Sequence, residues 1–143
     1  MGDRTSMFKR ESVEVVYKNR VYVFDALKSL NLSLENLNGM IEEHTEEYYL
    51  WRVLRDKVKA ELRRKKMEYE VSYNSKFFEA SMQLTNNGIM PSKQMIMGFI
   101  ETSTVFPPMR AKIRRLEEIM DKLDSVVYAL EHRKQMLYLA SQV

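Results

Sequence analysis

The stretch RRKKMEYE, residues 63–70, places four consecutive cations ahead of a methionine, two acids and a tyrosine. Residues 52–66 contain eight Lys and Arg side chains and two acids, a net charge of +6, although the whole 143-residue chain carries only +3. The rest of the chain therefore sums to −3. A protein that concentrates positive charge in this way creates a local field that attracts polyanions. The run is thus the first candidate for a binding site.

Phosphates and nucleobases are the groups that this run and its neighbours suit best. Lys and Arg bind phosphates with release of counterions, and aromatic rings beside them suit the unstacked bases of a single strand. The nucleic-acid-binding residues predicted on this basis are Lys57, Lys59, Arg63, Arg64, Lys65, Lys66, Tyr69 and Tyr73. An alternative stays open, in which the run is an ordinary solvated helix face whose cations pair with acids one turn away. Two acids cannot neutralise eight cations, which favours the polyanion site.

Catalytic and metal-binding constellations are missing from the sequence. The chain has no cysteine, no glycine-rich phosphate loop and no His-Glu metal motif. Its two histidines, His44 and His132, fall in different predicted helices, and we expect His44 to be packed in the interior with a hydrogen bond to a neighbour. The acids of IEEHTEEYY, Glu42, Glu43, Glu46 and Glu47, are predicted mostly to face solvent. We therefore expect a protein that is not an enzyme and that uses no metal and no cofactor.

The N-terminal segment allows two structures. Apolar residues from Val13 to Leu30 recur every three or four positions, which predicts an amphipathic helix, and we expect a helical extension over residues 1–32. The pieces VEVVY and RVYVF also alternate, so a strand or β-hairpin is the alternative. The first fourteen residues lack the apolar core of a signal peptide, and no run is long enough to span a membrane. We expect a cytoplasmic location, in a host cytoplasm if the chain is viral, and no membrane partner.

A long helix must position the basic run. Ser33 is a candidate cap for a helix that begins near Leu34, and apolar residues from there to Tyr69 follow heptad spacing. Asn38-Gly39 is a possible bend, since glycine costs about 1 kcal/mol inside a helix. Residues 40–84 contain no proline, so they are predicted to form one helix roughly 65 Å long. One small chain cannot cover such a rod, and this favours partner chains. Because Tyr48 and Trp51 lie on the heptad stripe, we predict them as core rather than as platforms for bases.

The rest of the chain predicts a connector and a second long helix. TNNGIMPS, residues 85–92, reads as a loop, Ser92 caps a short helix, and Pro107-Pro108 separate it from a helix over residues 108–141. The last helix carries an apolar stripe predicted for oligomerisation: Ile113, Leu116, Met120, Leu123, Val127, Leu130 and Leu137. The predicted fold is all-α, with long helices forming an α-hairpin with a short helical connector that oligomerises through heptad-like stripes. Residues 33–143 form the predicted single-stranded-DNA-binding and oligomerisation domain.

Four segments follow one another in an order that is typical of a known protein family. A tryptophan helix, YYLWRVLRDKVKAEL, leads into RKKMEYE, then into the short helix SKQMIMGFIETSTVF and the long helix LDSVVYALEHRKQMLYLASQ. This order resembles the phage recombination mediators of the UvsY type over residues 41–142. Those are small helical proteins that bind single-stranded DNA, form oligomers and help load a RecA-like recombinase onto strands coated by single-strand-binding protein. Residues 1–30 have no counterpart in the family, and VSYNSKFFEASMQL replaces its glycine-rich loop.

The resemblance also implies roles for single residues. The basic DNA-contacting element of the family reads cation, any residue, cation, aliphatic, acid, tyrosine, and it falls on residues 64–69. This implies that Arg64 and Lys66 contact phosphate. An arginine after an Ala-Leu pair falls on Arg133, in the helix that contributes to assembly in the family.

The expected function is therefore that of a recombination mediator in DNA recombination and repair. Its expected partners are single-stranded DNA, a RecA-like recombinase, single-strand-binding protein and further copies of the chain. The alternative is a structural or scaffolding coiled-coil assembly protein that uses the basic run to dock an acidic partner.

Overall fold

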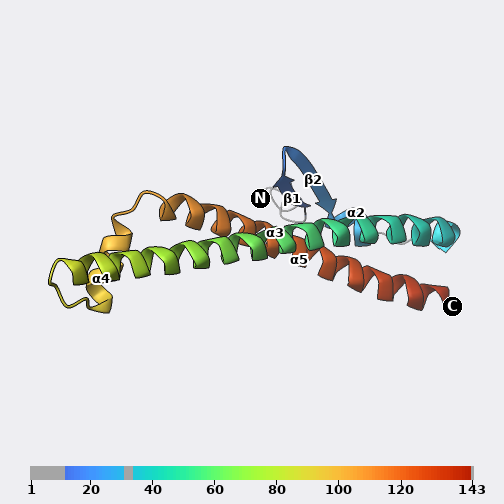
Figure 1. The fold of residues 1–143 in the computed structure, drawn as a ribbon. Helices are drawn as coiled ribbons and strands as arrows, with labels where there is room; N and C mark the ends of the chain where they lie inside the picture. Colours follow the sequence, from blue (N-terminus) through green and yellow to red (C-terminus); the bar gives the residue numbers. More distant parts are fainter. Residues whose placement is uncertain (1–11, 31–33, 143) are drawn as a thin grey trace, which may run out of the picture. The chain divides into compact units, whose positions relative to one another are not determined.

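A computed structural model describes residues 12–30 and 34–142 of the chain (Figure 1). Two long helices, α3 (Leu37–Asn86) and α5 (Phe106–Ser141), are joined by the short helix α4 (Lys93–Glu101). This confirms the predicted helical hairpin with a helical connector. The 3-10 turn η1 (Leu34–Asn36) precedes α3, and Ser33, the predicted cap, lies outside the described residues. Within those residues no helix has the length and apolar character needed to cross a bilayer.

Helix α3 is a single helix of 50 residues, about 75 Å long at the usual rise per residue. It runs through the predicted bend at Gly39 without interruption. Gly39 is the third residue of α3 and lies in its first turn, so it does not interrupt the helix interior. The long rod predicted from the absence of proline is therefore confirmed, and it begins and ends close to the predicted positions.

The loop between α3 and α4 follows its sequence signals. Gly88 has φ +74°, a left-handed conformation suited to glycine, and the Ile89 N–H donates to the carbonyl of Leu84 at 2.9 Å. The hydroxyl of Ser92 accepts from the Met95 N–H at 3.2 Å, which confirms the predicted cap of α4. Helix α5 begins at Phe106, two residues before the predicted start, because proline is compatible with the first turn of a helix.

The helix preferred for residues 13–30 is wrong over most of its length. Strands β1 (Ser12–Tyr17) and β2 (Arg20–Asp25) form an antiparallel hairpin, the alternative left open by the sequence, and only the short helix α2 (Ala26–Leu30) follows. The side chains alternate as a strand requires, since one face of the sheet buries Val15, Tyr17 and Phe24 while the intervening positions stay exposed.

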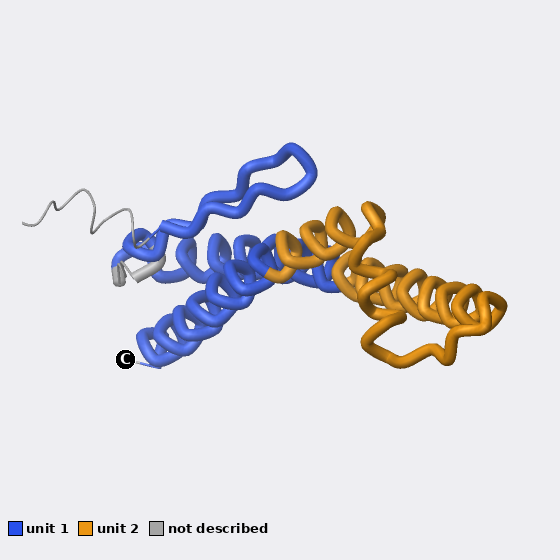
Figure 2. Tube along the Cα trace, turned by 90° about the vertical axis from the view of Figure 1, so that its left-hand side faces the viewer, with its two compact units in different colours: residues 1–59, 118–143 blue, residues 60–117 orange. Residues whose placement is uncertain are grey.

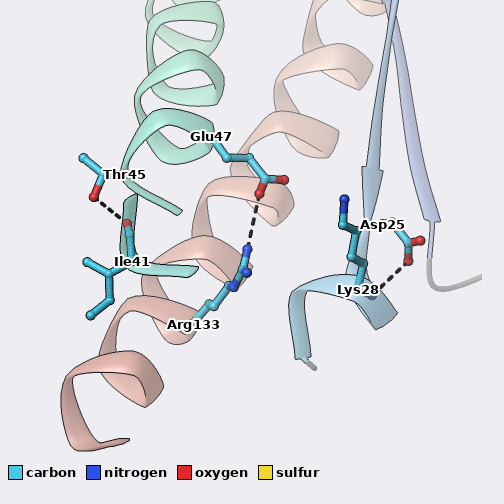
Figure 3. Close-up of polar contacts among 6 residues, drawn as sticks. All are labelled: Asp25, Lys28, Ile41, Thr45, Glu47 and Arg133. Carbon is cyan, nitrogen blue, oxygen red and sulfur yellow. Dashed lines mark hydrogen bonds and ion pairs between the residues drawn. The ribbon is translucent and has the colours of Figure 1, made fainter. Parts of the chain in front are cut away.

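The turn of this hairpin and the start of α2 have local causes. Lys18 and Asn19 both have positive φ, 48° and 63°, as a two-residue turn that matches the twist of the strands requires. Asn tolerates this conformation better than most residues. A continuous helix over residues 13–30 would have no turn at these positions. The Asp25 carboxylate then accepts from the backbone N–H groups of Leu27 and Lys28, at 3.1 and 3.2 Å, and so begins α2 (Figure 3).

The chain divides into two compact units (Figure 2). Unit 1 holds residues 1–59 and 118–143, and unit 2 holds residues 60–117. In unit 1 the hairpin places Tyr22 and Phe24 edge-on against Trp51, with ring centroids 6.2 and 6.1 Å apart. Trp51 is 7% exposed, so the prediction that it belongs to the core is confirmed.

Unit 2 has its own apolar cluster. Helix α4 contributes Ile96 and Ile100, α5 contributes Phe106, and the second part of α3 contributes Ala80 and Leu84. Figures 1 and 2 show the second part of α3 and the first part of α5 side by side in this unit. The cluster fixes the connector against the end of the long helix, because burial of these side chains is the main favourable contribution.

The stripe predicted for oligomerisation lies largely inside the chain's own core. Leu116, Leu123, Val127, Leu130 and Leu137 are buried, and the remaining two, Ile113 and Met120, are half-buried. The period of the stripe was therefore identified correctly, and its side chains pack within one copy of the chain.

Candidate nucleic-acid interface

The basic run lies on α3, which presents its cations at the surface. Arg63, Arg64 and Lys66 are exposed and Lys65 is half-buried. Neither Arg63 nor Lys66 makes an ion pair with any residue in the described part of the chain. Four adjacent cations on a helix repel one another, and a bound polyanion relieves that repulsion.

One acid partly neutralises this run. Glu68 lies 4.0 Å from Arg64 Nε and 3.4 Å from Lys65 Nζ, so its carboxylate is shared between two cations. The pairing supports the solvated-face interpretation for two of the four cations. Exposed pairs of this kind contribute about 0.3–0.5 kcal/mol and are weakened by salt. They are too weak to prevent a phosphate from replacing the carboxylate.

Tyr69 and Tyr73 have a packing role that the sequence did not indicate. Their rings stack on each other at 6.0 Å, and both lie edge-on to Phe106 at 5.8 Å. Both side chains are half-buried against the unit 2 cluster. The two tyrosines therefore fix the start of α5 against α3 beside the basic run, and only part of each ring remains open to a base.

The structure adds a second basic segment that sequence reasoning missed. Residues 110–115, RAKIRR, contain Arg110, Lys112, Arg114 and Arg115, all exposed on the first turns of α5. Phe106 contacts Tyr69 on α3, and α5 continues from there alongside the part of α3 that carries residues 63–66. Both helices rise about 1.5 Å per residue, so the two basic segments lie at similar heights in unit 2. The sequence feature that could have indicated it is the high density of cations in RAKIRR. The helical hairpin is needed to show that this segment lies at the height of RRKK.

Unit 2 carries a net positive charge, and most of its cations lie in these two segments. Residues 63–66 and 110–115 together hold eight cations and no acid. Unit 2 contains ten Lys and Arg residues and six acids, a net charge of +4, whereas unit 1 carries −1. The excess positive charge of the chain therefore lies in unit 2.

The remaining predicted cations belong to unit 1. Lys57 and Lys59 are both exposed on α3. Arg55, from the same charged window, lies 3.8 Å from Asp124 of α5, and Arg52 lies over the ring of Tyr48. Arg55 thus links α3 to α5 and Arg52 contacts a ring of its own helix, and Lys57 and Lys59 remain available to a ligand.

A buried polar group lies between the two helices of unit 1. Arg133, 6% exposed, donates to Glu47 at 3.3 Å (Figure 3), and Tyr48 donates its hydroxyl hydrogen to Glu131 at 3.1 Å. Glu42, Glu43 and Glu46 are exposed, as predicted, whereas Glu47 is half-buried in this pair. The arginine that the resemblance assigns to the assembly helix pairs within its own chain.

His44 is buried, as predicted, at 5% exposure and stacked on Tyr48. The expected hydrogen bond is not found, since neither ring nitrogen has a partner among the described residues. Burial lowers the pKa of His44 below its ordinary value of 6.5, and the charges of Arg133 and Lys134 lower that pKa further. The ring is thus neutral at physiological pH and belongs to the core.

The described residues contain no group of three or more His, Asp or Glu side chains placed to hold a metal ion. What they do contain is two exposed cation-rich segments, residues 63–66 of α3 and 110–115 of α5, beside the aromatic contacts of Tyr69, Tyr73 and Phe106. Comparison of the chain with protein-family models, with curated proteins and with solved structures finds no match.

Proposed function

We propose that this protein is a recombination mediator that binds single-stranded DNA without sequence preference and helps load a RecA-like recombinase. The observation that supports this most directly is the pairing of residues 63–66 of α3 with residues 110–115 of α5, eight cations without an acid. A phosphate backbone is the polyanion that such a surface binds through release of counterions. The likeness to the UvsY type supplies the recombination role.

In the proposed mechanism the cations hold the strand by its phosphates and read no sequence. Arg63 and Lys66, which have no ion-pair partner in the described part of the chain, bind phosphate directly. Arg64 and Lys65 do so after exchanging the Glu68 carboxylate for a phosphate oxygen. Several copies of the chain repeat these weak contacts along one strand, so that the strand is held firmly and each contact can be released singly. A strand held in this way passes from single-strand-binding protein to the recombinase.

The test is a titration of labelled oligo-dT, mixed single strand and duplex at several salt concentrations. We expect tighter binding of single strands and little dependence on their sequence. Arg64→Ala combined with Lys66→Ala should weaken binding of every strand and make the dependence of log K on log salt shallower, by roughly 0.7 per lost contact. Both side chains are exposed, so the folding free energy should change by no more than about 0.5 kcal/mol.

Two further variants make this test specific. Arg110→Ala with Arg114→Ala should have the same effect if α5 contributes half of the surface. Lys28→Ala with Lys93→Ala removes the same charge from exposed positions on α2 and α4, and it should leave affinity nearly unchanged. If all three double variants behave alike, the protein responds only to net charge and the proposed surface is wrong. If DNA binding is absent and an acidic protein is bound instead, the scaffold function replaces the proposed one.

A further inference from the structure

A groove between the β-hairpin and α3 lies entirely within unit 1. It has a volume of about 730 Å³ and is bounded on one side by residues 17–23 and on the other by residues 50–57. The pairing of Tyr17 with Arg20 across the turn places Arg20 on the face of the sheet that also carries Tyr22. The hairpin that replaced the expected helix thus creates a site that no helical N-terminus would form.

The walls of the groove are apolar and partly aromatic. Trp51 and Tyr22 contact each other edge-on at 6.2 Å, and both line the groove. Leu50, Val21 and Val23 extend these walls and are each more than half exposed. A flat apolar ring that entered the groove would cover these side chains and leave fewer of them in water.

Every charged side chain that lines the groove is positive. These are Lys18 and Arg20 at the turn of the hairpin and Lys57 on α3. Lys18 Nζ lies 5.4 Å from the centre of the Tyr17 ring, which holds it at the groove. No Asp or Glu lines the groove, so it combines an apolar interior with an uncompensated charge of three cations.

Apolar walls with a cationic rim suit a ligand that has a flat ring and an attached anion. We propose that this groove binds a nucleotide, with the base against Tyr22 and the apolar walls and the phosphate at Lys18, Arg20 and Lys57. The source we favour is a nucleotide of the bound single strand, and to that extent the inference rests on the proposed function. Lys57 supports it, because this residue lines the groove and is one of the cations of residues 52–66 predicted to bind nucleic acid. A free nucleotide has the same chemistry and is the other source.

Trp51 makes the proposal directly measurable. It is the only tryptophan of the chain and it lines the groove, so its fluorescence reports on what enters. The full-length protein is titrated with oligo-dT, with thymidine monophosphate and with inorganic phosphate. We expect oligo-dT to quench or shift Trp51 emission and phosphate alone to leave it unchanged. Thymidine monophosphate should act only at much higher concentration if the strand is the natural source, and at similar concentration if the free nucleotide is.

Lys18→Ala with Arg20→Ala is the variant that tests the rim. Both side chains are exposed, and their removal should lower the affinity for oligo-dT roughly tenfold, reduce the salt slope by about 1.4 and weaken the Trp51 response. Lys28→Ala with Lys93→Ala is the control of equal charge and should keep the response of the wild type. Tyr22→Leu keeps an apolar side chain against Trp51 and removes the ring, and it should lower affinity with an unchanged salt slope.

The possible failures are distinguishable. If oligo-dT binds and depends on Arg64 and Lys66 but Trp51 emission stays constant, the groove is empty and the proposed function stands. If neither oligo-dT nor thymidine monophosphate changes Trp51 emission at low salt, the groove proposal is wrong whatever the chain binds. If thymidine monophosphate acts but no strand binds, the groove is a free-nucleotide site and the proposed function fails.

Discussion

His44 illustrates how one buried side chain couples this fold to pH. Its ring is neutral in the folded chain because burial, Arg133 and Lys134 all lower its pKa. The unfolded chain takes up a proton on this ring near pH 6.5, and the folded chain does so only at lower pH. The unfolded state therefore binds more protons in that interval, and the free energy of unfolding falls as the pH drops below about 6.5. Loss of stability stops once the pH is below the pKa of the folded state.

The corresponding variant is His44→Phe. The phenyl ring can keep the stacking on Tyr48 and cannot titrate, and the nitrogens that it removes have no partner among the described residues. We expect the wild type to lose stability more steeply than the variant between pH 7.5 and 5.5, with a difference in slope of at most about 1.4 kcal/mol per pH unit. Urea unfolding at a series of pH values measures it. Parallel pH profiles for the two proteins would show that the ring does not resist protonation.

Among secondary-structure elements, the β-hairpin is the one whose formation depends most on a local conformation. Asn19 sits in the left-handed region with φ 63°, where a β-branched residue is strained by about 1–2 kcal/mol. Asn19→Val should therefore loosen the hairpin, whereas Asn19→Gly should preserve or slightly strengthen it. Amide hydrogen exchange of β1 and β2 measures the change, and Trp51 emission reports whether Tyr22 and Phe24 remain packed on its ring. Equal protection in the two variants would mean that the turn does not limit the stability of the hairpin.

For the molecule as a whole, the prediction concerns assembly. The apolar stripe of α5 is largely buried within one chain. Helix α3 in unit 2, in contrast, exposes the apolar side chains of Met67, Val71, Phe78 and Met82. Their separations of four, seven and four residues place them on one face of the helix. We expect this face to contact a second copy of the chain, because water exposure of such a stripe is unfavourable and the proposed strand binding needs repeated surfaces.

Light scattering or native mass spectrometry tests the assembly. The wild type should have at least twice the mass of one chain, and Phe78→Glu should shift it toward the monomer while leaving the helix content unchanged. Tyr128→Glu is the matched control, since that residue is an equally exposed aromatic that belongs to unit 1. A monomeric wild type at tens of micromolar would contradict the prediction, and an equal effect of both variants would move the contact elsewhere.

The sequence by itself determined the long helices, the connector and the cationic run. Helix length follows from uninterrupted heptad spacing and the absence of proline, and Ser92 and Gly88 mark boundaries through local backbone chemistry. These features are local, so neighbouring residues are enough to predict them. The exposure of Arg64 and Lys66 was predictable for the same reason, because charged side chains are rarely buried without a partner.

Only the tertiary structure decided what depends on residues far apart in the chain. Residues 12–25 satisfy a helical and a strand pattern, and the hairpin prevails because Tyr22 and Phe24 then pack on Trp51. RAKIRR became part of the candidate interface only when α5 placed it level with the run on α3. Tyr69 and Tyr73, which were expected to stack on bases, pack edge-on against Phe106. In each case the role of a side chain depends on which part of the chain, distant in sequence, packs against it. The spacing of residue types along the sequence does not identify that packing partner.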